Sequence, residues 1–345
     1  MHLEEKIKSI IKSSKRDMRL DVFLELLLYD KNGYYYQQKP IGKRADFITA
    51  PEISQIFGEI IGIYLYYYWA KKINKKFNFI ELGPGNGTLF NDITNCLVKF
   101  PQFFEKAKVT FVEVNKELKR IQKTKIKNKY LSKISWNEKI NFKSKKPSII
   151  YSNEFFDCFP VRQFFLKKIW KEKYVNYDEN LKKFFFKDKK VNSKKLLSLL
   201  KNFNEQKILE ISLKRNSYFE KICKYIKLNG GIFLTIDYGY FDSNENFTLQ
   251  AIQNHKFSHI FEDLGQKDVS SHVNFNDFLD IAKKNKLKIQ EYCTQREFLI
   301  KYGILERAKK ISELFKSEDI VTQLDKLISN KEMGKLFKCI VVSNL

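Results

Sequence analysis

The sequence has no long hydrophobic segment, which argues against a protein anchored by a membrane-spanning helix. Its longest uncharged apolar run covers residues 60–70, whereas a membrane-spanning helix needs about 20 such residues. The N-terminal segment MHLEEKIKSII contains two glutamates, which argues against a signal or transit peptide. We therefore expect a soluble protein without a membrane span, in the bacterial cytoplasm, or in the mitochondrial matrix if a leader has been removed.

Cysteine and histidine are scarce. The five cysteines lie at least 46 residues apart and form no CxxC pair, so we expect free thiols instead of a disulfide framework or a zinc site. Of the four histidines, His255 and His259 have a spacing that metal ligands use, with Glu262 and His272 downstream. The segment has no helical pattern, and we expect no metal site.

Arginine is also scarce, although the chain is strongly basic. Only 8 of the 64 basic residues are arginine, against 40 acidic residues and a net charge of +24. Nucleic-acid-binding proteins concentrate their charge and use arginine for bidentate contacts. The lysine excess therefore indicates a compositional bias along the whole chain and argues against a nucleic-acid partner.

The apolar residues, 43% of the chain, follow an alternating strand and helix pattern. We expect helices over 1–30, 52–70, 115–128 and 216–228, an amphipathic helix from Leu89 to Leu97, and strands over 77–82, 108–114, 148–156 and 231–240. This order predicts an α/β fold with a parallel sheet. The pattern ends with a helix near 275–284, a strand, a helical segment over 303–336 and a last strand over 336–343.

One insertion interrupts the α/β pattern. Residues 162–190 alternate apolar and charged side chains, which predicts a β-meander, and residues 241–275 look mostly irregular. We therefore expect an N-terminal helical extension over 1–75, a core over 76–161 and 205–345 with a loop-rich segment at 241–275, and an inserted β-meander over 162–204.

A glycine-rich loop, ELGPGNGT (81–88), follows the first predicted strand. Gly83, Gly85 and Gly87 allow a sharp turn and close approach of a ligand, and the next helix offers its free N–H groups. The loop lacks the lysine of a phosphate-binding loop and the GxGxxG spacing of a dinucleotide fingerprint. With Glu81 two positions before the first glycine, it instead resembles motif I of class I S-adenosylmethionine methyltransferases.

A second acid supports a nucleoside ligand. Glu113 lies at the end of the next predicted strand, where an acid accepts both ribose hydroxyl groups. NAD-dependent enzymes share this feature, so Glu113 alone does not choose between the two cofactors. We also assign Asn153 and Trp136 to the cofactor site, with core packing as the alternative role for Trp136.

Seven segments together resemble the MidA-type methyltransferases, a family that includes the mitochondrial protein arginine methyltransferase that assists assembly of respiratory complex I. They are ADFITAPEISQIFGE (45–59), ELGPGNGTL (81–89), NEFFDCFPVRQF (153–164), IDYGY (236–240), DVSSHVNF (268–275), TQREFLIKYGILER (294–307) and MGKLFK (333–338). They occur in the family's order over nearly the whole chain. The sequence departs from the family pattern at two places. Ala45 stands where the family usually has glycine, and DVSSHVNF (268–275) stands where the family has DxTAHVDF.

The resemblance implies a Rossmann-like class I methyltransferase core with an N-terminal helical extension and an inserted substrate-facing element. It implies S-adenosylmethionine as the cofactor and a protein arginine as the methyl acceptor. The client that it implies is a subunit of respiratory complex I, and the reaction is a direct in-line methyl transfer.

Two acids are candidates for binding the substrate guanidinium. Glu154 and Asp157 belong to NEFFD, at the carboxyl end of a predicted strand, where open α/β sheets bind their ligands. Carboxylates bind a guanidinium bidentately, and Phe155 and Phe156 would form an apolar wall. The alternative is a capped turn with aromatic residues in the core.

Four further residues are assigned to a lid over the substrate or cofactor. The resemblance places Asp46, Thr49 and Glu52 near the cofactor, although TAPE also reads as a helix N-cap followed by proline. His272 is expected to be an ordered hydrogen-bonding residue near the mouth of the active site.

Three other functions remain open. An RNA or DNA methyltransferase would carry an Asn/Asp-Pro-Pro-aromatic motif where this chain has Asn153-Glu154-Phe155-Phe156, and the prolines are absent. A non-catalytic assembly factor would not need the intact glycine loop. A nicotinamide oxidoreductase is disfavoured by the glycine spacing.

Overall fold

The computed structural model describes residues 2–37, 49–201, 207–242, 245–253, 256–315 and 319–344. The chain divides into two compact units. The core unit comprises Ile41–Phe155, Tyr218–Phe241 and Val273–Leu345, and the accessory unit comprises Met1–Pro40, Phe156–Ser217 and Asp242–His272. This division differs from the expected one, because residues 49–75 pack within the core unit and residues 245–272 pack with the meander.

The core unit is built on an eight-stranded sheet of the described residues. In spatial order the strands are β15 (Lys288–Thr294), β16 (Phe337–Ser343), β10 (Gly231–Tyr240), β5 (Ser148–Asn153), β2 (Phe77–Leu82), β3 (Ala107–Val112) and β4 (Ile134–Asn137), with the short β14 (Val273–Asn274) beside the end of β10. The five strands from β10 to β4 are parallel, whereas β16 runs antiparallel between β10 and β15. Every side chain of β2 is buried, as the apolar run FNFIEL predicts for a strand covered on both faces.

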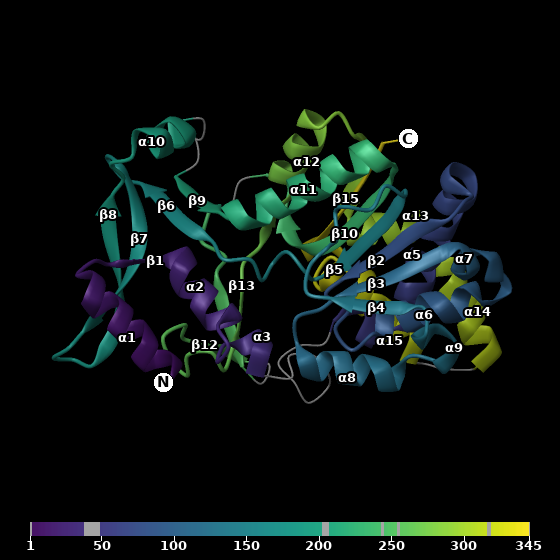
Figure 1. Ribbon diagram of the computed structural model, residues 1–345, viewed down its shortest axis with the longest axis horizontal. Helices are drawn as coiled ribbons and strands as arrows, with labels where there is room; N and C mark the ends of the chain where they lie inside the picture. Colours follow the sequence, from purple (N-terminus) through teal and green to yellow (C-terminus); the bar gives the residue numbers. More distant parts are fainter. Residues whose placement is uncertain are drawn as a thin grey trace. The chain divides into compact units, whose positions relative to one another are not determined.

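The winding of this sheet reverses between β2 and β5. From β2 the chain continues outward to β3 and β4, whereas β5 and β10 lie on the other side of β2 (Figure 1). Ligands of doubly wound sheets bind outside the carboxyl ends of the strands at such a reversal. Leu82 ends β2 and Asn153 ends β5 at this point, so the glycine loop and the NEFFD segment both begin there.

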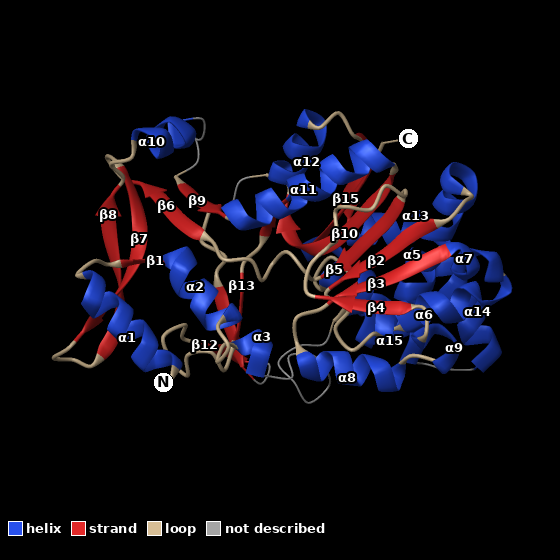
Figure 2. Cartoon of the chain, viewed as in Figure 1, coloured by secondary structure: helices blue, strands red, loops and turns tan. Residues whose placement is uncertain are grey.

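Helices cover both faces of the core sheet (Figure 2). They are α4 (Ala50–Ile53), α5 (Gln55–Tyr68), α6 (Thr88–Cys96), α8 (Lys116–Lys125), α11 (Leu213–Asn229), α12 (Phe275–Lys284), α13 (Gln295–Lys301), α14 (Ile304–Phe315), α15 (Asp319–Ile328) and α16 (Met333–Leu336). Helices α5 and α6 approach closely because Gly58 has no side chain: a Cβ there would lie 2.6 Å from the Cβ of Asp92. Phe219 of α11 stacks on Phe278 of α12, with ring centroids 4.0 Å apart.

The accessory unit contains the predicted meander. Its larger sheet holds β1 (Met18–Arg19), β6 (Arg162–Leu166), β7 (Trp170–Asp178), β8 (Lys183–Lys190) and β9 (Ile208–Ile211). The antiparallel pairing of β6 with β7 and of β7 with β8 confirms the meander over 162–190. The unit also has a small sheet of β11 (Gln250–Gln253), β12 (Lys256–Ser258) and β13 (Asp268–Ser270), and helices α1 (Leu3–Ser14), α2 (Leu20–Tyr29), α3 (Tyr34–Gln37) and α10 (Lys194–Lys201).

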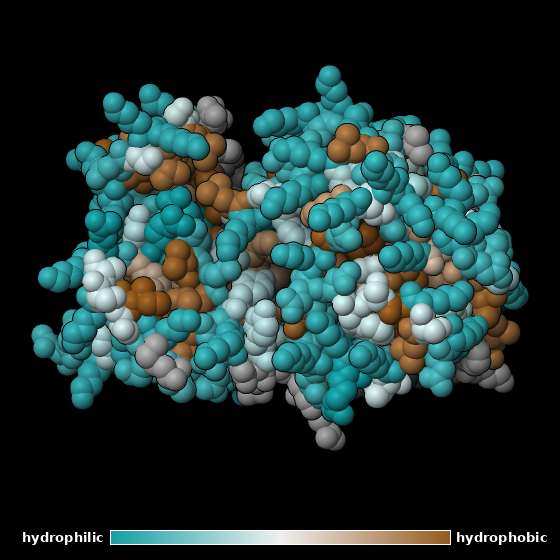
Figure 3. Space-filling view, viewed as in Figure 1, coloured by the Kyte–Doolittle hydropathy of each residue, from teal (hydrophilic) through white to brown (hydrophobic). Residues whose placement is uncertain are grey.

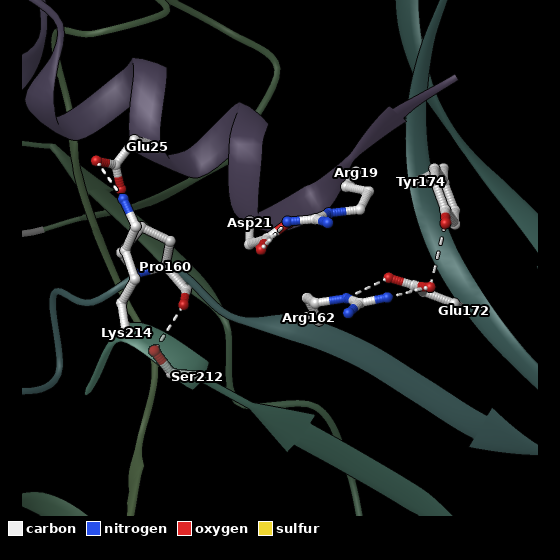
Figure 4. Close-up of polar contacts among 9 residues, drawn as sticks. All are labelled: Arg19, Asp21, Glu25, Pro160, Arg162, Glu172, Tyr174, Ser212 and Lys214. Atoms are coloured by element: carbon white, nitrogen blue, oxygen red, sulfur yellow. Dashed lines mark hydrogen bonds and ion pairs between the residues drawn. The ribbon is translucent and has the colours of Figure 1, made fainter. Parts of the chain in front are cut away.

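A buried ion pair fixes the register of the meander (Figure 4). Arg162 of β6 donates to Glu172 of β7 through Nε at 2.6 Å and Nη2 at 2.8 Å, and Tyr174 donates its hydroxyl group to the same carboxylate at 3.2 Å. Buried charges are tolerated when the partner geometry is good and further hydrogen bonds are present. Both conditions hold here, so the pair ties two strands together at the base of the meander.

Three segments differ from the expectation. Residues 1–30 form two helices instead of one, because Lys15 ends α1 with φ of 50° and the chain then forms β1 against β7. The segment 241–275 contains β11, β12 and β13, which are too short and too polar to show a strand pattern. Residues 303–336 do not form one continuous helix in their described part, because α15 ends at Ile328 and α16 begins at Met333. Among the described helices, none has the length and apolar character to cross a membrane.

Candidate functional site

The glycine loop adopts the conformation that its composition predicts. Gly83, Gly85 and Gly87 have φ of 60°, 53° and 79°, values that other L-residues rarely adopt. A Cβ on Gly83 would lie only 2.9 Å from the ring of Phe155. Helix α6 then begins at Thr88, and no side chain caps its first N–H groups. The loop therefore presents close backbone and helix N–H groups at the end of β2.

A pocket lies at this reversal of the sheet, entirely within the core unit. Its lining includes seven residues that the sequence assigned to the site: Thr49, Glu52, Glu81, Gly83, Gly85, Asn153 and Glu154. Three of these are carboxylates, and no lysine or arginine is among the lining residues. In a chain with a net charge of +24, this pocket is a local concentration of acidic side chains.

Glu81 is the next-to-last residue of β2, Glu113 directly follows the neighbouring β3, and both are buried. Burial raises the pKa of Glu81 to about 8, against the hydrogen bond of 2.9 Å that Tyr151 donates to it, and the nearby Glu113 adds to the rise. Burial likewise raises the pKa of Glu113 to about 7, although the N–H of Asn115 donates to it at 2.8 Å. Glu81 lines the pocket and Glu113 does not, and acids with perturbed pKa values are typical of functional sites.

Gln122 connects these parts, and sequence reasoning missed it. Its amide donates to the carbonyl of Gly85 at 2.7 Å and to Glu113 at 3.3 Å, and its oxygen accepts the indole N–H of Trp136 at 2.8 Å. Gln122 is fully buried on α8, four residues after the buried Leu118. The sequence signal that could have identified Gln122 is its position as a polar residue on the apolar face of a basic helix. Trp136 itself lies in β4, with its ring edge against Phe111.

Glu52 holds the start of α6 from a second direction. Its carboxylate accepts hydrogen bonds from the hydroxyl group of Thr88 and, at 3.3 Å, from the amide of Asn86. Lys125 of α8 lies 3.5 Å from the same oxygen. Thr49 occupies the N-cap position of α4, with Pro51 in the first turn, but its side chain makes no capping bond. Asp46, the fourth residue of the expected lid segment, lies outside the described residues.

Glu154 has the most unusual backbone of the site. Its φ is 51°, and non-glycine residues in this region are often held there by functional constraints. The N–H of Ala50 donates to its carboxylate at 3.2 Å and the amide of Asn153 at 2.7 Å. The next N–H, of Phe155, donates to the fully buried Asp237 at 3.0 Å. The carboxylate is therefore fixed at the end of β5, facing the pocket.

Asp157 and His272 lie in the accessory unit, around a buried arginine that the sequence did not single out. Arg215 donates to the carbonyl of Phe156 at 2.8 Å, the hydroxyl group of Ser271 at 2.9 Å and the carbonyl of His272 at 3.2 Å. Burial raises the pKa of Asp157 to about 6, and the charge of Arg215 opposes that rise. Arg215 thus clamps the NEFFD and DVSSHVNF segments together.

The histidine pair offers no metal centre within the described residues. His255 lies outside them, and His259 accepts the N–H of Phe261 at 3.3 Å in a turn. No group of three histidine, cysteine or acidic side chains among the described residues is arranged to hold an ion.

The chemistry of the pocket lining suits S-adenosylmethionine better than a dinucleotide. That molecule carries a positive sulfonium and a positive ammonium group with one carboxylate, so an acidic lining that includes Glu52 and Glu154 complements it, whereas a pyrophosphate would be repelled. Glu113 suits ribose hydroxyl groups, and the uncapped N–H groups of α6 suit a carboxylate. The Oδ1 atom of Asn153 is buried without a hydrogen-bond partner in the described structure, which leaves an acceptor for the ligand.

Comparisons with known proteins agree with this chemistry. A family model for S-adenosyl-L-methionine-dependent methyltransferases matches residues 60–293. The NDUFAF7 homologue of Caenorhabditis elegans, a mitochondrial protein arginine methyltransferase by name, is 30% identical over 336 residues, which cover 89% of this chain and 78% of that protein. Human NDUFAF7, with the same activity in its name, is 28% identical over 340 residues, covering 91% and 77%.

The fold has a solved counterpart. The crystal structure of a Burkholderia thailandensis protein bound to S-adenosyl-homocysteine has a TM-score of 0.86 and 22% identity, covering 99% of this chain and 91% of that one. A native crystal structure of a protein of the same superfamily from the same organism has a TM-score of 0.85 and 21% identity, covering 99% of this chain and 91% of that one. The chain therefore belongs to the MidA-type family of S-adenosyl-L-methionine-dependent methyltransferases, as its motifs predicted.

Proposed function

We propose that this protein transfers a methyl group from S-adenosylmethionine to an arginine of a protein client. The observation that carries the proposal is the Glu154 carboxylate, which lines the cofactor pocket from a left-handed backbone position at the end of β5. Relatives over about nine-tenths of the chain are named protein arginine methyltransferases. The acceptor class rests on this carboxylate and on those relatives.

Glu154 is proposed to bind the substrate guanidinium. Arginine remains positively charged at neutral pH, and its planar fork binds a carboxylate through two parallel hydrogen bonds. The bonds from Ala50 and Asn153 fix the orientation of the Glu154 carboxylate, so a bound guanidinium would take a defined direction. Asp157, three residues further along the same segment, is proposed as the second carboxylate, and Phe155 as an apolar wall.

The remaining site residues are proposed to hold the cofactor. S-adenosylmethionine, when bound, supplies an electrophilic methyl group that leaves its sulfur in line. Glu113 would bind the ribose and Glu81 the positively charged end, while Gln122 keeps Glu113 and the glycine loop in register. The arginine nitrogen that takes up the methyl group gives one proton to solvent. Orientation and charge pairing, instead of a strong base, then account for the rate.

The client and the compartment follow from the family resemblance. A subunit of respiratory complex I is the proposed client, and the compartment is proposed to be the bacterial cytoplasm or the mitochondrial matrix. The relatives are mitochondrial by name. Thr49, Glu52 and Asp46 are proposed to close over the cofactor, with His272 near the entrance.

The test is the Glu154→Gln variant, with Glu138→Gln as a matched control because Glu138 is an exposed carboxylate after β4. Calorimetry measures the binding of S-adenosylhomocysteine. For methyl transfer, the client protein is incubated with labelled S-adenosylmethionine and then hydrolysed, and the labelled methylarginine is measured. We expect Glu154→Gln to bind normally and to lose methyl transfer by about 100-fold or more. Full activity in that variant would refute the role of Glu154.

The alternatives give different results in the same assay. Label that enters nuclease-sensitive material would identify a nucleic-acid methyltransferase. Client binding without any turnover would identify an assembly factor that has lost its chemistry. Binding of NADH in place of S-adenosylhomocysteine would identify an oxidoreductase.

A further inference from the structure

The positive charge is not spread evenly along the chain, in contrast to the expectation from composition. Residues 162–201, which cover the meander and α10, contain 13 basic and 4 acidic residues. Residues 116–133, around α8, contain 8 basic and 1 acidic residue. Together, these two segments carry most of the net charge of +24. The basicity is therefore local, and the meander lies in the unit that does not hold the cofactor pocket.

A groove in the accessory unit gathers part of this charge. It has a volume of about 740 Å³, within the range of roughly 300–1,000 Å³ typical of ligand sites. Six cationic side chains line it: Lys8, Lys12, Lys15, Arg16, Lys187 and Lys189. They come from α1, the α1–β1 connection and β8. Figure 3 shows hydrophilic side chains projecting around the β7–β8 hairpin and α1.

Two carboxylates of the groove are already neutralised. Asp17 lies 3.2 Å from Lys187 and 3.0 Å from Lys189, and Glu179 lies 3.6 Å from Lys12. The Lys12–Glu179 pair is largely exposed, and such pairs contribute little and exchange readily.

Within the described structure, Lys15 and Arg16 make no ion pair. Lys8 is paired with Glu4 at 2.8 Å and Glu5 at 2.9 Å, so the excess positive charge of the groove lies mainly at Lys15 and Arg16, where an anionic partner would neutralise it.

We propose that this groove docks an acidic segment of the client protein. Its cations alternate with the apolar Ile11 and Tyr177 and with Asn176, a mixture that suits the side chains and backbone of a peptide. The single arginine among the lining cations gives little bidentate phosphate recognition, which argues against a nucleic acid. An acidic peptide instead places single carboxylates against the lysines, which bind as point charges.

Docking in this groove separates recognition from chemistry. The inference rests on the proposed function, because it assumes a protein client. Charged docking sites mainly change the association rate and the apparent affinity. A groove variant would therefore raise KM for the whole client and leave kcat unchanged. It would also leave the binding of S-adenosylhomocysteine unchanged, because the cofactor pocket is formed by the core unit alone.

The test compares the full-length Lys15→Glu/Arg16→Glu variant with a Lys71→Glu/Lys72→Glu control. The control removes the same charge at exposed lysines of the core unit. Fluorescence anisotropy measures the binding of a labelled oligoglutamate peptide and of a labelled single-stranded RNA at low and physiological salt. We expect the groove variant to lose about tenfold in peptide affinity and the control to remain unchanged.

Two outcomes would overturn the inference. Equal peptide affinity in the wild-type protein and the groove variant would show that the groove is not the docking site. RNA binding that exceeds peptide binding and depends on the same two residues would assign the groove to a nucleic acid. Neither binding measurement involves methyl transfer, so the two proposals can fail independently. Full activity of Glu154→Gln would reject its role in the proposed function, whereas the peptide-binding result tests the groove alone.

Discussion

Gln122 donates a hydrogen bond of 2.7 Å to the carbonyl of Gly85, and this bond joins α8 to the turn of the glycine loop. The same amide group reaches Glu113, and the amide oxygen accepts from Trp136. One buried side chain thus sets the positions of the loop, the acid proposed for the ribose, and the tryptophan beside it. Residues around a binding site often act through such positioning contacts.

We predict that Gln122→Ala lowers the affinity for S-adenosylhomocysteine by about tenfold and destabilises the protein by about 1–3 kcal/mol. The reason is that Glu113, Trp136 and the Gly85 carbonyl each lose a buried partner. Calorimetry and thermal melting measure the two effects. Gln102→Ala is the control, because Gln102 makes one hydrogen bond of 3.3 Å to Tyr66 away from the pocket. Equal affinities in the two variants would contradict the positioning role.

The raised pKa values of Glu81 and Glu113 predict how stability depends on pH. Both acids have an ordinary pKa of 4.5 and a folded-state pKa of about 8 and about 7. Between pH 4.5 and 8 the folded protein therefore binds more protons than the unfolded chain, so the free energy of unfolding falls as pH rises, by about 1.4 kcal/mol for each unit of pKa shift.

Glu81→Gln should remove part of this fall, so that its melting temperature exceeds that of the wild-type protein at pH 8 but not at pH 4. Ligand affinity should change in the opposite direction. Glu113 must be ionised to accept two ribose hydroxyl groups, so the affinity for S-adenosylhomocysteine should increase from pH 6 to pH 8. A flat affinity profile in the wild-type protein would exclude Glu113 from that role.

Gly83 gives a test that separates strain from crowding. Gly83→Ala adds a Cβ at φ of 60°, 2.9 Å from Phe155. Gly303→Ala adds one at φ of 92°, where the nearest atom is 3.5 Å away. We expect the control to lose about 1–2 kcal/mol from backbone strain alone. Gly83→Ala should lose more and should also lose ligand affinity, measured by melting and calorimetry; equal losses would mean that the contact with Phe155 does not matter.

The sequence predicts the elements whose signals are local. Three elements have the expected bounds: the strands Phe77–Leu82 and Gly231–Tyr240 and the helix Phe275–Lys284. Apolar runs and glycines mark the strands, and an asparagine N-cap marks the helix. The glycine loop was also predicted, since its spacing requires positive φ. These features depend on a few neighbouring residues and need no knowledge of the rest of the fold.

The polar contacts between distant segments could not be predicted in the same way. Gln122 and Gly85 are 37 residues apart, and Thr88 bonds to Glu52 across 36 residues. Arg215 meets carbonyl groups 59 residues before it and 57 residues after it. Each contact depends on where backbone carbonyls and carboxylates lie after the sheet has assembled, and no periodicity in the sequence reports that.

Arg215 supports the last prediction, in which two variants distinguish geometry from charge. Arg215→Lys keeps the positive charge but replaces a planar fork of donors by one ammonium group, which cannot reach Phe156, Ser271 and His272 together. We expect this variant to lose about 2–3 kcal/mol of stability. Arg120→Lys, at an exposed pair with Glu117, should change little.

Arg215→Gln removes the charge as well, so the pKa of Asp157 should rise above its value of about 6, because the charge of Arg215 now opposes the effect of burial. If Asp157 binds the substrate guanidinium in its ionised form, methyl transfer is lost as the pH is lowered through the pKa of Asp157. The midpoint of this loss should lie at a higher pH in Arg215→Gln than in Arg215→Lys. The comparison is made on kcat/KM profiles of both variants from pH 6 to pH 8.5. Superimposable profiles would show that Asp157 does not bind the substrate, and would leave Glu154 as the proposed guanidinium carboxylate.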